Sequence, residues 1–378
     1  MPPPLPTPPL SPTAAGSAEA AAADRYRAAG LADLSPACFG LVMATGIVSI
    51  AAHLLGLPRV AQALLWLNVP AYAVLWLLSA ARMARHRRRF FRDLTDHRLG
   101  PGFFTTVAGT TVLGCQFVML ADDFRTAHAL WLLALALWLC LTYAIFAALT
   151  VKEQKPRLDL GINGGWLLAV VATQSIAVLA AMLAAHETAV WKLALNFLAL
   201  SMWLWGGMLY IWMMSLIFYR YTFFRLSPAD LAPPYWINMG AMAISTLAGS
   251  LLIINAPHAP FLHSLLPFLK GFTILYWATG TWWIPMLLVL AVWRHGYKRF
   301  PFRYDPLYWG AVFPLGMYAT CTRQMGVAMG FGFLDPVATV FLYAALTAWV
   351  TVFAGLLADL WWRVGGSRPV WQRRPGPR

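Results

Sequence analysis

Small and hydroxyl-bearing residues recur together at five places along this 378-residue chain. Each motif contains a threonine, and successive threonines are 63 to 74 residues apart. The motifs are Met43-Ala44-Thr45-Gly46, Ala108-Gly109-Thr110-Thr111, Val171-Ala172-Thr173-Gln174, Ile244-Ser245-Thr246 and Tyr318-Ala319-Thr320. Such groups can serve close helix packing, because small residues let helices approach and Thr bonds its own backbone. Their repetition in register favours a second interpretation, in which they line a path for a polar solute.

Groups suited to acid–base, metal or redox chemistry are scarce in the apolar parts of the chain. Of the 14 acidic residues, only Asp359 lies within an apolar segment, and Asp335 stands at the end of one. The eight histidines fall in connections or near segment ends, and the four cysteines show no CxxC spacing. We therefore expect no catalytic centre, no cofactor and no metal site.

The composition is typical of an integral membrane protein. Hydrophobic residues make up 60% of the chain, tryptophan alone numbers 19, and charged residues reach only 11%, against about 25% in soluble domains. A soluble fold could not cover that much apolar surface with polar groups. We therefore expect the lipid bilayer to surround most of the protein.

Ten apolar segments are long enough to cross a hydrocarbon core as helices, which takes about 20 residues. They fall at 36–56, 61–81, 103–121, 126–149, 163–185, 190–218, 233–254, 264–293, 306–331 and 335–361. Continuously apolar runs favour helices over barrel strands, which alternate with a period of two. The expected fold class is an all-α integral membrane protein with ten transmembrane helices.

The basic residues are concentrated in alternate connections between these segments. One set of connections, together with both chain ends, holds most of the 28 Lys and Arg residues, whereas the other set keeps only Arg59 and Arg125. The positive-inside rule then places both termini in the cytoplasm. The same rule accounts for nearly all of the net charge of +14. We interpret the basic run from Arg82 to Arg92 as a topology determinant that meets anionic lipid, and we expect no nucleic-acid partner.

The segments pair into five helical hairpins, because the outer connections are short. The second segment of each pair is rich in Leu and Trp and suits contact with lipid, whereas the first carries the small and hydroxyl residues. Five similar first helices predict pseudo-fivefold symmetry around a central pore. Pro314 leaves the carbonyl of Gly310 without its helical donor, so this carbonyl either faces a cavity or marks a simple packing kink.

Three regions are expected along the chain. Residues 1–32 are rich in Pro and Ala and predict a disordered cytoplasmic tail. Residues 33–362 predict a ten-helix transporter or channel domain, and residues 363–378 a basic cytoplasmic tail. The expected location is the cell (inner) membrane, with a multi-pass topology.

Several short motifs make the chain resemble the tellurite-resistance/C4-dicarboxylate transporter family, over about residues 33 to 362. This family includes the bacterial TehA proteins, the fungal malate permeases and sulfite efflux pumps, and the slow anion channels of plants. The motifs are Ser35-Pro36-x-x-Phe39-Gly40, Ala44-Thr45-Gly46, Pro101-Gly102-Phe103 and Trp309-x-x-x-Phe313-Pro314-Leu315. Each is moderately specific, and their order along ten segments is more telling.

The resemblance implies a homotrimer in which each subunit has its own pore. In the family the odd-numbered helices line that pore, and a phenylalanine from the ninth helix plugs it. Phe313, followed by Pro314, matches the plug. From the residues alone, Phe313 could equally well face lipid.

Two further groups of residues are candidates for the path. The expected pore-lining residues combine the motif threonines with aromatics near the start of the first helices: Phe39, Thr45, Phe104, Thr110, Trp166, Thr173, Trp236, Thr246 and Thr320. Lys192, Lys270 and Arg323 lie toward the outer ends of their segments. These three either extend to the interface or make the outer mouth attractive to anions.

A path with hydroxyl groups and no carboxylate tolerates an anion better than a cation. With a negative cell interior, each exported negative charge gains about 2.3 kcal/mol per 100 mV. The sequence therefore predicts uniport or efflux of small anions, such as a C4-dicarboxylate like malate, sulfite or inorganic anions. A proton-coupled dicarboxylate symporter is the alternative, and a membrane-embedded redox enzyme or a purely structural role is less favoured.

Overall fold

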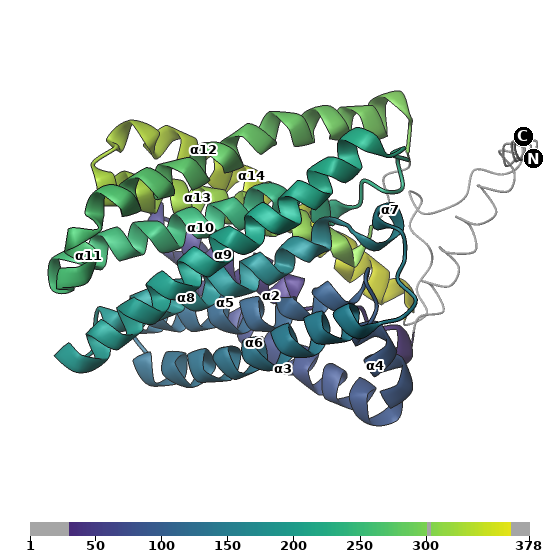
Figure 1. The fold of residues 1–378 in the computed structure, drawn as a ribbon, viewed down its shortest axis with the longest axis horizontal. Coiled ribbons are helices and arrows are strands. Elements are labelled where there is room, and N and C mark those ends of the chain that lie inside the picture. Colours follow the sequence, from purple (N-terminus) through teal and green to yellow (C-terminus); the bar gives the residue numbers. More distant parts are fainter. Residues whose placement is uncertain (1–29, 301–303, 364–378) are drawn as a thin grey trace, which may run out of the picture.

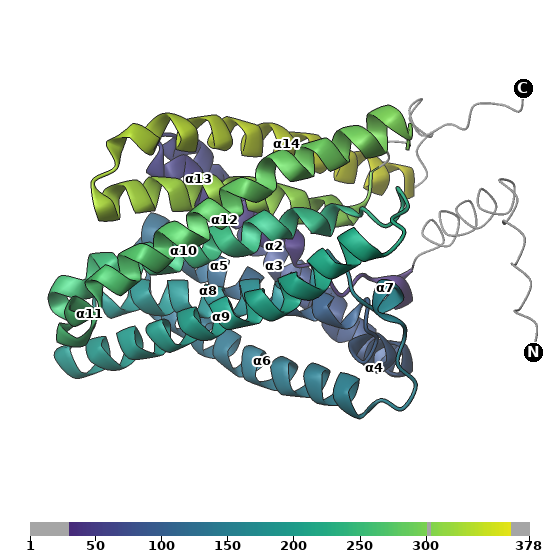
Figure 2. The ribbon, with the colours of Figure 1, turned by 45° about the horizontal axis from the view of Figure 1, so that its top comes forward.

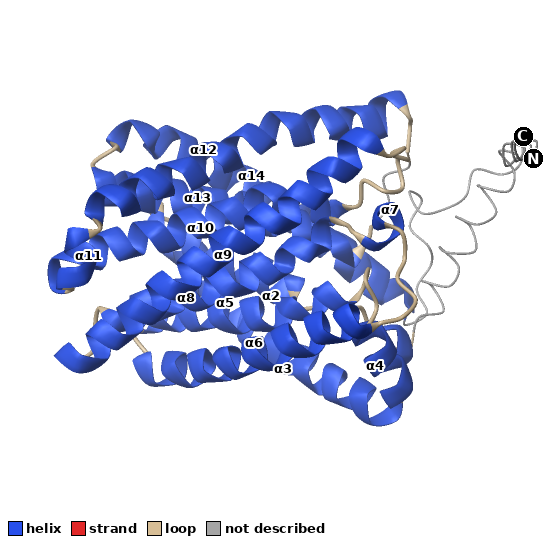
Figure 3. Ribbon diagram, viewed as in Figure 1, coloured by secondary structure: helices blue, strands red, loops and turns tan. Residues whose placement is uncertain are grey.

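The computed structural model describes residues 30–300 and 304–363, and these residues form helices and turns without any strand (Figure 3). The all-helical fold class expected from the apolar runs is therefore confirmed for the described part of the chain. Of the expected regions, the tails at 1–32 and 363–378 lie almost entirely outside it.

Each of the ten expected segments contains one long helix. The first helices of the pairs are α2 (Gly40–Leu54), α5 (Phe104–Ala121), α8 (Leu168–Ala184), α10 (Ile237–Asn255) and α13 (Trp309–Met329). The second helices are α3 (Pro58–Arg85), α6 (Phe124–Val151), α9 (Ala189–Phe223), α12 (Leu266–Val292) and α14 (Asp335–Arg363). Figure 1 shows them running side by side, with short helix α11 (Pro260–Ser264) at one end and α4 (Arg87–Leu94) and α7 (Leu158–Gly161) at the other.

Eight of the described helices are long and apolar enough to cross a membrane. The two first helices outside this group are α2 and α13. Helix α2 has 15 residues and so spans only about 22 Å at 1.5 Å per residue. Helix α13 has 21 residues, but its sequence includes Arg323 and Gln324, which lower its hydropathy.

The two members of each pair differ in burial. In their most apolar 18-residue windows, α5, α8 and α10 have 78%, 94% and 89% of their residues buried, whereas α3, α6, α12 and α14 have only 17–22%. Helix α9 is intermediate at 56%. The first helices therefore form the interior, and the Leu- and Trp-rich second helices form the surface that lipid covers.

The first helices pack in a closed series. Helix α2 packs on α5, α5 on α8, α8 on α10, α10 on α13, and α13 again on α2. Each second helix packs on its own partner and also on the first helix of the next pair (Figure 2). The chain thus builds an inner set of five helices surrounded by an outer set of five.

Helix α13 runs without interruption through Pro314. The pyrrolidine ring packs closely against α10, because a methyl group at Gly240 would lie only 2.8 Å from Cγ of Pro314. Gly46 plays a similar part in α2, where an added methyl group would lie 2.5 Å from Cγ1 of Val112. These glycines lie inside continuous helices and allow close approach, so the small residues serve packing here.

Basic residues at the ends of the second helices bind the neighbouring connections. Arg82 forms a buried ion pair with Asp93 of α4, and Lys152 Nζ donates a 3.1 Å hydrogen bond to the carbonyl of Thr95. Arg220 lies 3.2 Å from Asp230. Part of the basic charge of these segments therefore attaches the connections to the helix bundle.

Candidate functional site

Two cavities lie along the axis of the inner helices, and all five of these helices contribute to the larger one. The larger cavity lies among the C-terminal halves of the inner helices, is called the outer cavity below, and has a volume of about 80 Å³. Its lining includes Ile47 of α2, Val112 of α5, Val178 of α8, Leu247 of α10 and Met317 of α13. A cavity that touches all five members of a closed helix series lies at the centre of that series.

The second, smaller cavity lies at the other end of the same helices, is called the inner cavity below, and has a volume of about 30 Å³. Its lining residues come from the first turns of the inner helices and include Gly40, Thr105, Leu168, Ile237 and Gly310. Gly310, whose carbonyl loses its helical donor to Pro314, therefore lies at this cavity.

Phe313 lines the smaller of the two cavities. It is only 1% exposed, while Met317, one helical turn further along α13, lines the outer cavity. Pro314 holds this part of α13 against α10 through its contact at Gly240. The side chain of Phe313 therefore lies in the interior of the bundle, at the smaller cavity.

The polar groups of the outer cavity are hydroxyls, one amide and the thiol of Cys115. Thr111, Ser175 and Thr320 line it together with Gln324. Each hydroxyl donates to a carbonyl of its own helix: Ser175 to Ala172 at 2.7 Å and Thr320 to Gly316 at 2.9 Å. None of the described residues that line either axial cavity is acidic or basic.

Of the five motif threonines, Thr320 alone is among the residues that line these cavities. Thr45 accepts a 3.0 Å hydrogen bond from the indole of Trp349, and Thr173 accepts one of 2.8 Å from Trp138. The Thr110 hydroxyl lies 2.9 Å from that of Tyr72. These three hydroxyls thus contact the outer helices.

Thr246, the remaining motif threonine, is fully buried and donates to the carbonyl of Met242 at 2.9 Å. The hydroxyls that do line the outer cavity, Thr111 and Ser175, lie one or two residues beyond the motif threonines. Sequence reasoning missed them, although the adjacent pair Thr110-Thr111 was a signal that a second hydroxyl could face the centre.

The structure does not bring the expected aromatics together with Phe313 around these cavities. Phe39 packs edge-on against Trp76 of α3 at 5.2 Å between ring centroids, and Phe104 lies 6.2 Å from Phe146 of α6. The indole of Trp166 donates to the carbonyl of His97 at 2.9 Å.

Trp236, the last of these aromatics, lines a separate lateral cavity. Contacts with the outer helices account for the burial of Phe39 and Phe104, whereas Trp166 and Trp236 are half-buried.

The three basic residues expected near the outer mouth differ in their surroundings. Arg323 Nη1 lies 2.8 Å from both carboxylate oxygens of Asp335, so an acid compensates its charge. Lys192 and Lys270 belong to the outer helices α9 and α12, where Lys270 is exposed and Lys192 half-buried. The structure places these two on the outer layer of the bundle.

Within residues 30–300 and 304–363 no group of three His, Cys, Asp or Glu side chains could hold a metal ion.

His97 lies at the end of the bundle where the connections are rich in Lys and Arg, called the basic end below. Burial and the nearby Lys152 ammonium lower the pKa of His97 below its ordinary value.

The fold and these cavities define a multi-pass membrane protein with two small cavities along the axis of its inner helices. Comparison with known families identifies the family to which this membrane protein belongs. The model of the SLAC1 family, described as voltage-dependent anion channels, matches residues 33–357. The chain belongs to this family, which confirms the resemblance to the TehA-like and slow anion channel proteins.

Individual relatives carry related names. The chain is 25% identical to the sulfite efflux pump SSU1 of Trichophyton rubrum over 352 residues, covering 86% of this chain and 90% of that protein. It is 25% identical to an uncharacterized transporter of Methanocaldococcus jannaschii, covering 79% and 86%. An uncharacterized membrane protein of Mycobacterium tuberculosis is 36% identical over 159 residues, or 42% of this chain and 80% of that protein.

Proposed function

We propose that this protein moves small anions across the cell membrane through the axis of its inner helices, with Phe313 as the gate and Pro314 fixing its helix. The observation that carries the proposal is the burial of Phe313 at the smaller axial cavity, one helical turn before Met317, which lines the larger one. Hydrophobic constrictions of this kind close pores by excluding water.

In this proposal, ten helices cross the bilayer with both termini in the cytoplasm. The inner five are related by pseudo-fivefold symmetry, which the closed packing series supports. Helices α2 and α13 cross inside the bundle, where neighbouring helices rather than lipid surround them. Each subunit then has its own path, and we propose a homotrimer as the assembly.

The native substrate belongs to the class of small anions that includes C4-dicarboxylates, sulfite and inorganic anions. The similarity to the fungal sulfite efflux pump, which covers 86% of this chain, supports sulfite as the first anion to test. The lining hydroxyls Thr111, Ser175 and Thr320 and the amide of Gln324 would replace part of the hydration shell of the anion.

Transport is expected to be uniport in the direction of efflux. A negative interior favours export by about 2.3 kcal/mol per 100 mV for each negative charge, and twice that for a dianion. The axial cavities present no described carboxylate or histidine that could carry a proton. This supports uniport over the alternative of proton-coupled symport.

Proteoliposomes test the proposal. Sulfite, malate and chloride are loaded in turn, and efflux is followed while a potassium diffusion potential and a pH gradient are set independently. We expect anion efflux to increase with an interior-negative potential and to be insensitive to the pH gradient. Efflux that follows the pH gradient and ignores the potential would establish symport, and a flux no larger than in protein-free vesicles for every anion would refute anion transport.

A further inference from the structure

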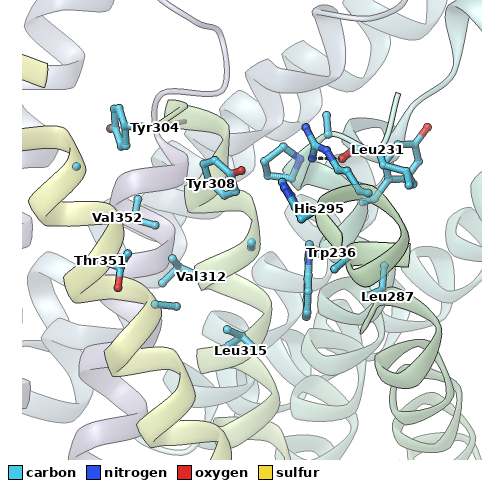
Figure 4. A pocket seen from close by; sticks show the side chains of 18 of the residues that line it. Leu231, Trp236, Leu287, His295, Tyr304, Tyr308, Val312, Leu315, Thr351 and Val352 are labelled. Atoms are coloured by element: carbon cyan, nitrogen blue, oxygen red, sulfur yellow. Dashed lines mark hydrogen bonds between the residues drawn. The ribbon is translucent and has the colours of Figure 1, made fainter. Parts of the chain in front are cut away.

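A cavity of about 610 Å³ opens on the side of the bundle, outside the ring of inner helices. It lies between the ends of α12 and α14, and the outward face of α13 forms its back wall (Figure 4). Its volume falls within the range of about 300–1,000 Å³ that is typical of ligand sites. None of the residues that line it belongs to the lining of the outer axial cavity.

The cavity is apolar along most of its length. Leu287 and Leu290 of α12 form one side, and Ala348 and Val352 of α14 form the other. Helices α12 and α14 have only 22% and 17% of their apolar windows buried, so they border lipid. The cavity therefore opens toward the acyl region of a bilayer.

Its polar end differs in character and carries a cation. Arg294 lines the cavity there together with His295, Tyr304 and Tyr308, which Figure 4 places at the same end. Arg294 Nη1 donates to the carbonyl of Leu231, and the guanidinium lies 4.4 Å from the centre of the Phe300 ring.

The Arg294 guanidinium still has donor capacity to offer. Its Nε is buried and has no hydrogen-bond partner among the described atoms. None of the described residues that line the cavity is acidic. The carboxylate of Asp305, which does not line the cavity, interacts electrostatically with this guanidinium. An anion at this end would still meet guanidinium donors, which bind phosphate oxygens in well-defined geometry.

We propose that this lateral cavity binds an anionic phospholipid, with the phosphate at Arg294 and one acyl chain between α12 and α14. The apolar walls account for the acyl chain, and Arg294 accounts for the charged head group. Connections rich in Lys and Arg lie at this end of the bundle and add to the attraction for an anionic leaflet.

The bound lipid would contact the helix that carries Phe313. Val312 and Leu315 of α13 line the lateral cavity, whereas Phe313 lines the inner axial cavity. An acyl chain in the lateral cavity therefore supports α13 from the side opposite to the axis. The binding itself does not depend on the proposed transport function and is tested by a binding measurement.

The full-length protein is reconstituted in phosphatidylcholine vesicles that contain a small fraction of phosphatidylglycerol with a photoactivatable diazirine in its acyl chain. After illumination, the labelled peptides are identified by mass spectrometry. We expect labelling of the α12 and α14 peptides that line the cavity, and about fivefold less of it in Arg294→Gln. Lys298→Gln, which removes a nearby charge that does not line the cavity, should retain the wild-type labelling.

A second variant tests the acyl site separately from the charge. Ala348→Phe fills the cavity between α12 and α14 and should abolish labelling at those peptides while sparing label elsewhere on the outer helices. A phosphatidylcholine probe that labels the wild type as strongly as phosphatidylglycerol would overturn the proposal. So would labelling unchanged in both Arg294→Gln and Ala348→Phe, or the absence of label in the wild type, which would mean that protein covers the cavity.

Discussion

The indole nitrogen of Trp349 donates a 3.0 Å hydrogen bond to the hydroxyl of Thr45 and thereby joins the last helix to the first. Equivalent bonds run from each outer helix to the inner helix of the next pair. They link Tyr72 with Thr110, Trp138 with Thr173, Trp203 with the carbonyl of Ser245, and Trp277 with Thr322. With the bond from Trp349 the series closes, so each outer helix fixes the rotation of the next inner helix.

Loss of the closing bond should destabilise the protein measurably. In Trp349→Phe the Thr45 hydroxyl loses its indole donor, and we expect a lower melting temperature that corresponds to about 1 kcal/mol. In the double variant with Thr45→Val, the cost of Trp349→Phe should shrink, because the hydroxyl is already absent. The control is Trp361→Phe on the same helix, where the side chain is 72% exposed. Equal losses in both tryptophan variants would show that the bond contributes nothing.

Two glycine-to-alanine substitutions, one at the contact between α10 and α13 and one on the outer helix α12, should have opposite effects on stability. Gly240→Ala places a methyl group 2.8 Å from Pro314 and should lower the melting temperature, because two packed helices must separate. Gly271→Ala lies in α12 with nothing within 4 Å of the added methyl group. It should stabilise the helix by about 0.5–1 kcal/mol. Thermal unfolding of both variants in the same detergent checks the signs.

The hydroxyls that line the outer cavity should affect conduction more than the motif threonines that contact outer helices. Thr111→Val and Ser175→Ala remove polar groups from the path, and we expect each to lower anion flux by about tenfold if it removes one such interaction of roughly 1.4 kcal/mol. Thr110→Val removes the contact with Tyr72 and should chiefly lower stability. Tracer flux and melting temperature are measured on each variant, and a larger flux loss in Thr110→Val than in Thr111→Val would reverse the assignment.

The ion pair between Arg323 and Asp335 predicts an electrostatic effect at the outer end. Asp335→Asn leaves the guanidinium charge uncompensated, so anion flux at low salt should rise by about two- to fivefold, and 0.5 M salt should remove most of the gain. Arg323→Gln leaves the Asp335 carboxylate uncompensated instead, so anion flux at low salt should fall by a similar factor. A gain that persists at high salt would indicate a structural cause.

Acidification should destabilise the basic end of the bundle. The pKa of His97 is lowered in the folded protein from an ordinary value of 6.5, so the unfolded chain binds a proton more readily. Stability is therefore retained above pH 6.5 and decreases as the pH falls through the lower folded value. Melting temperatures between pH 7.5 and 5.0 should fall less in His97→Asn than in the wild type. An identical fall in both proteins would contradict this contribution of His97.

The sequence predicts the outer helices more completely than it predicts the inner helices. Each outer helix has one face toward lipid and one face toward the inner helices. Its Leu- and Trp-rich composition therefore already identifies it as part of the outer layer. Inner helices are buried on every side, and a helix that is apolar all round gives no periodic signal for the face that meets the axis. The sequence therefore located the inner helix of Thr110 and Thr111 but could not tell which hydroxyl faces the centre.

Pairings between separate helices explain the remaining differences. Phe39 and Phe104 look like gate residues in the sequence because both lie at the start of an inner helix, yet Trp76 and Phe146 of the outer helices cover them. The compensation of Arg323 by Asp335 arises only when the turn between α13 and α14 brings both together. Phe313 was predicted as the gate through a motif shared with a family and not through any local pattern.

The central claim is that Phe313 alone closes an axial path, and current recorded across a planar bilayer tests it most directly. Phe313→Ala joins the two cavities, and we expect its anion current at a fixed potential to exceed that of the wild type by about tenfold or more. Phe104→Ala is the matched control, because its side chain is also 1% exposed but packs on an outer helix, and its current should remain near the wild-type level. A Phe313→Ala current equal to that of the wild type, in a protein that still folds, would contradict the account.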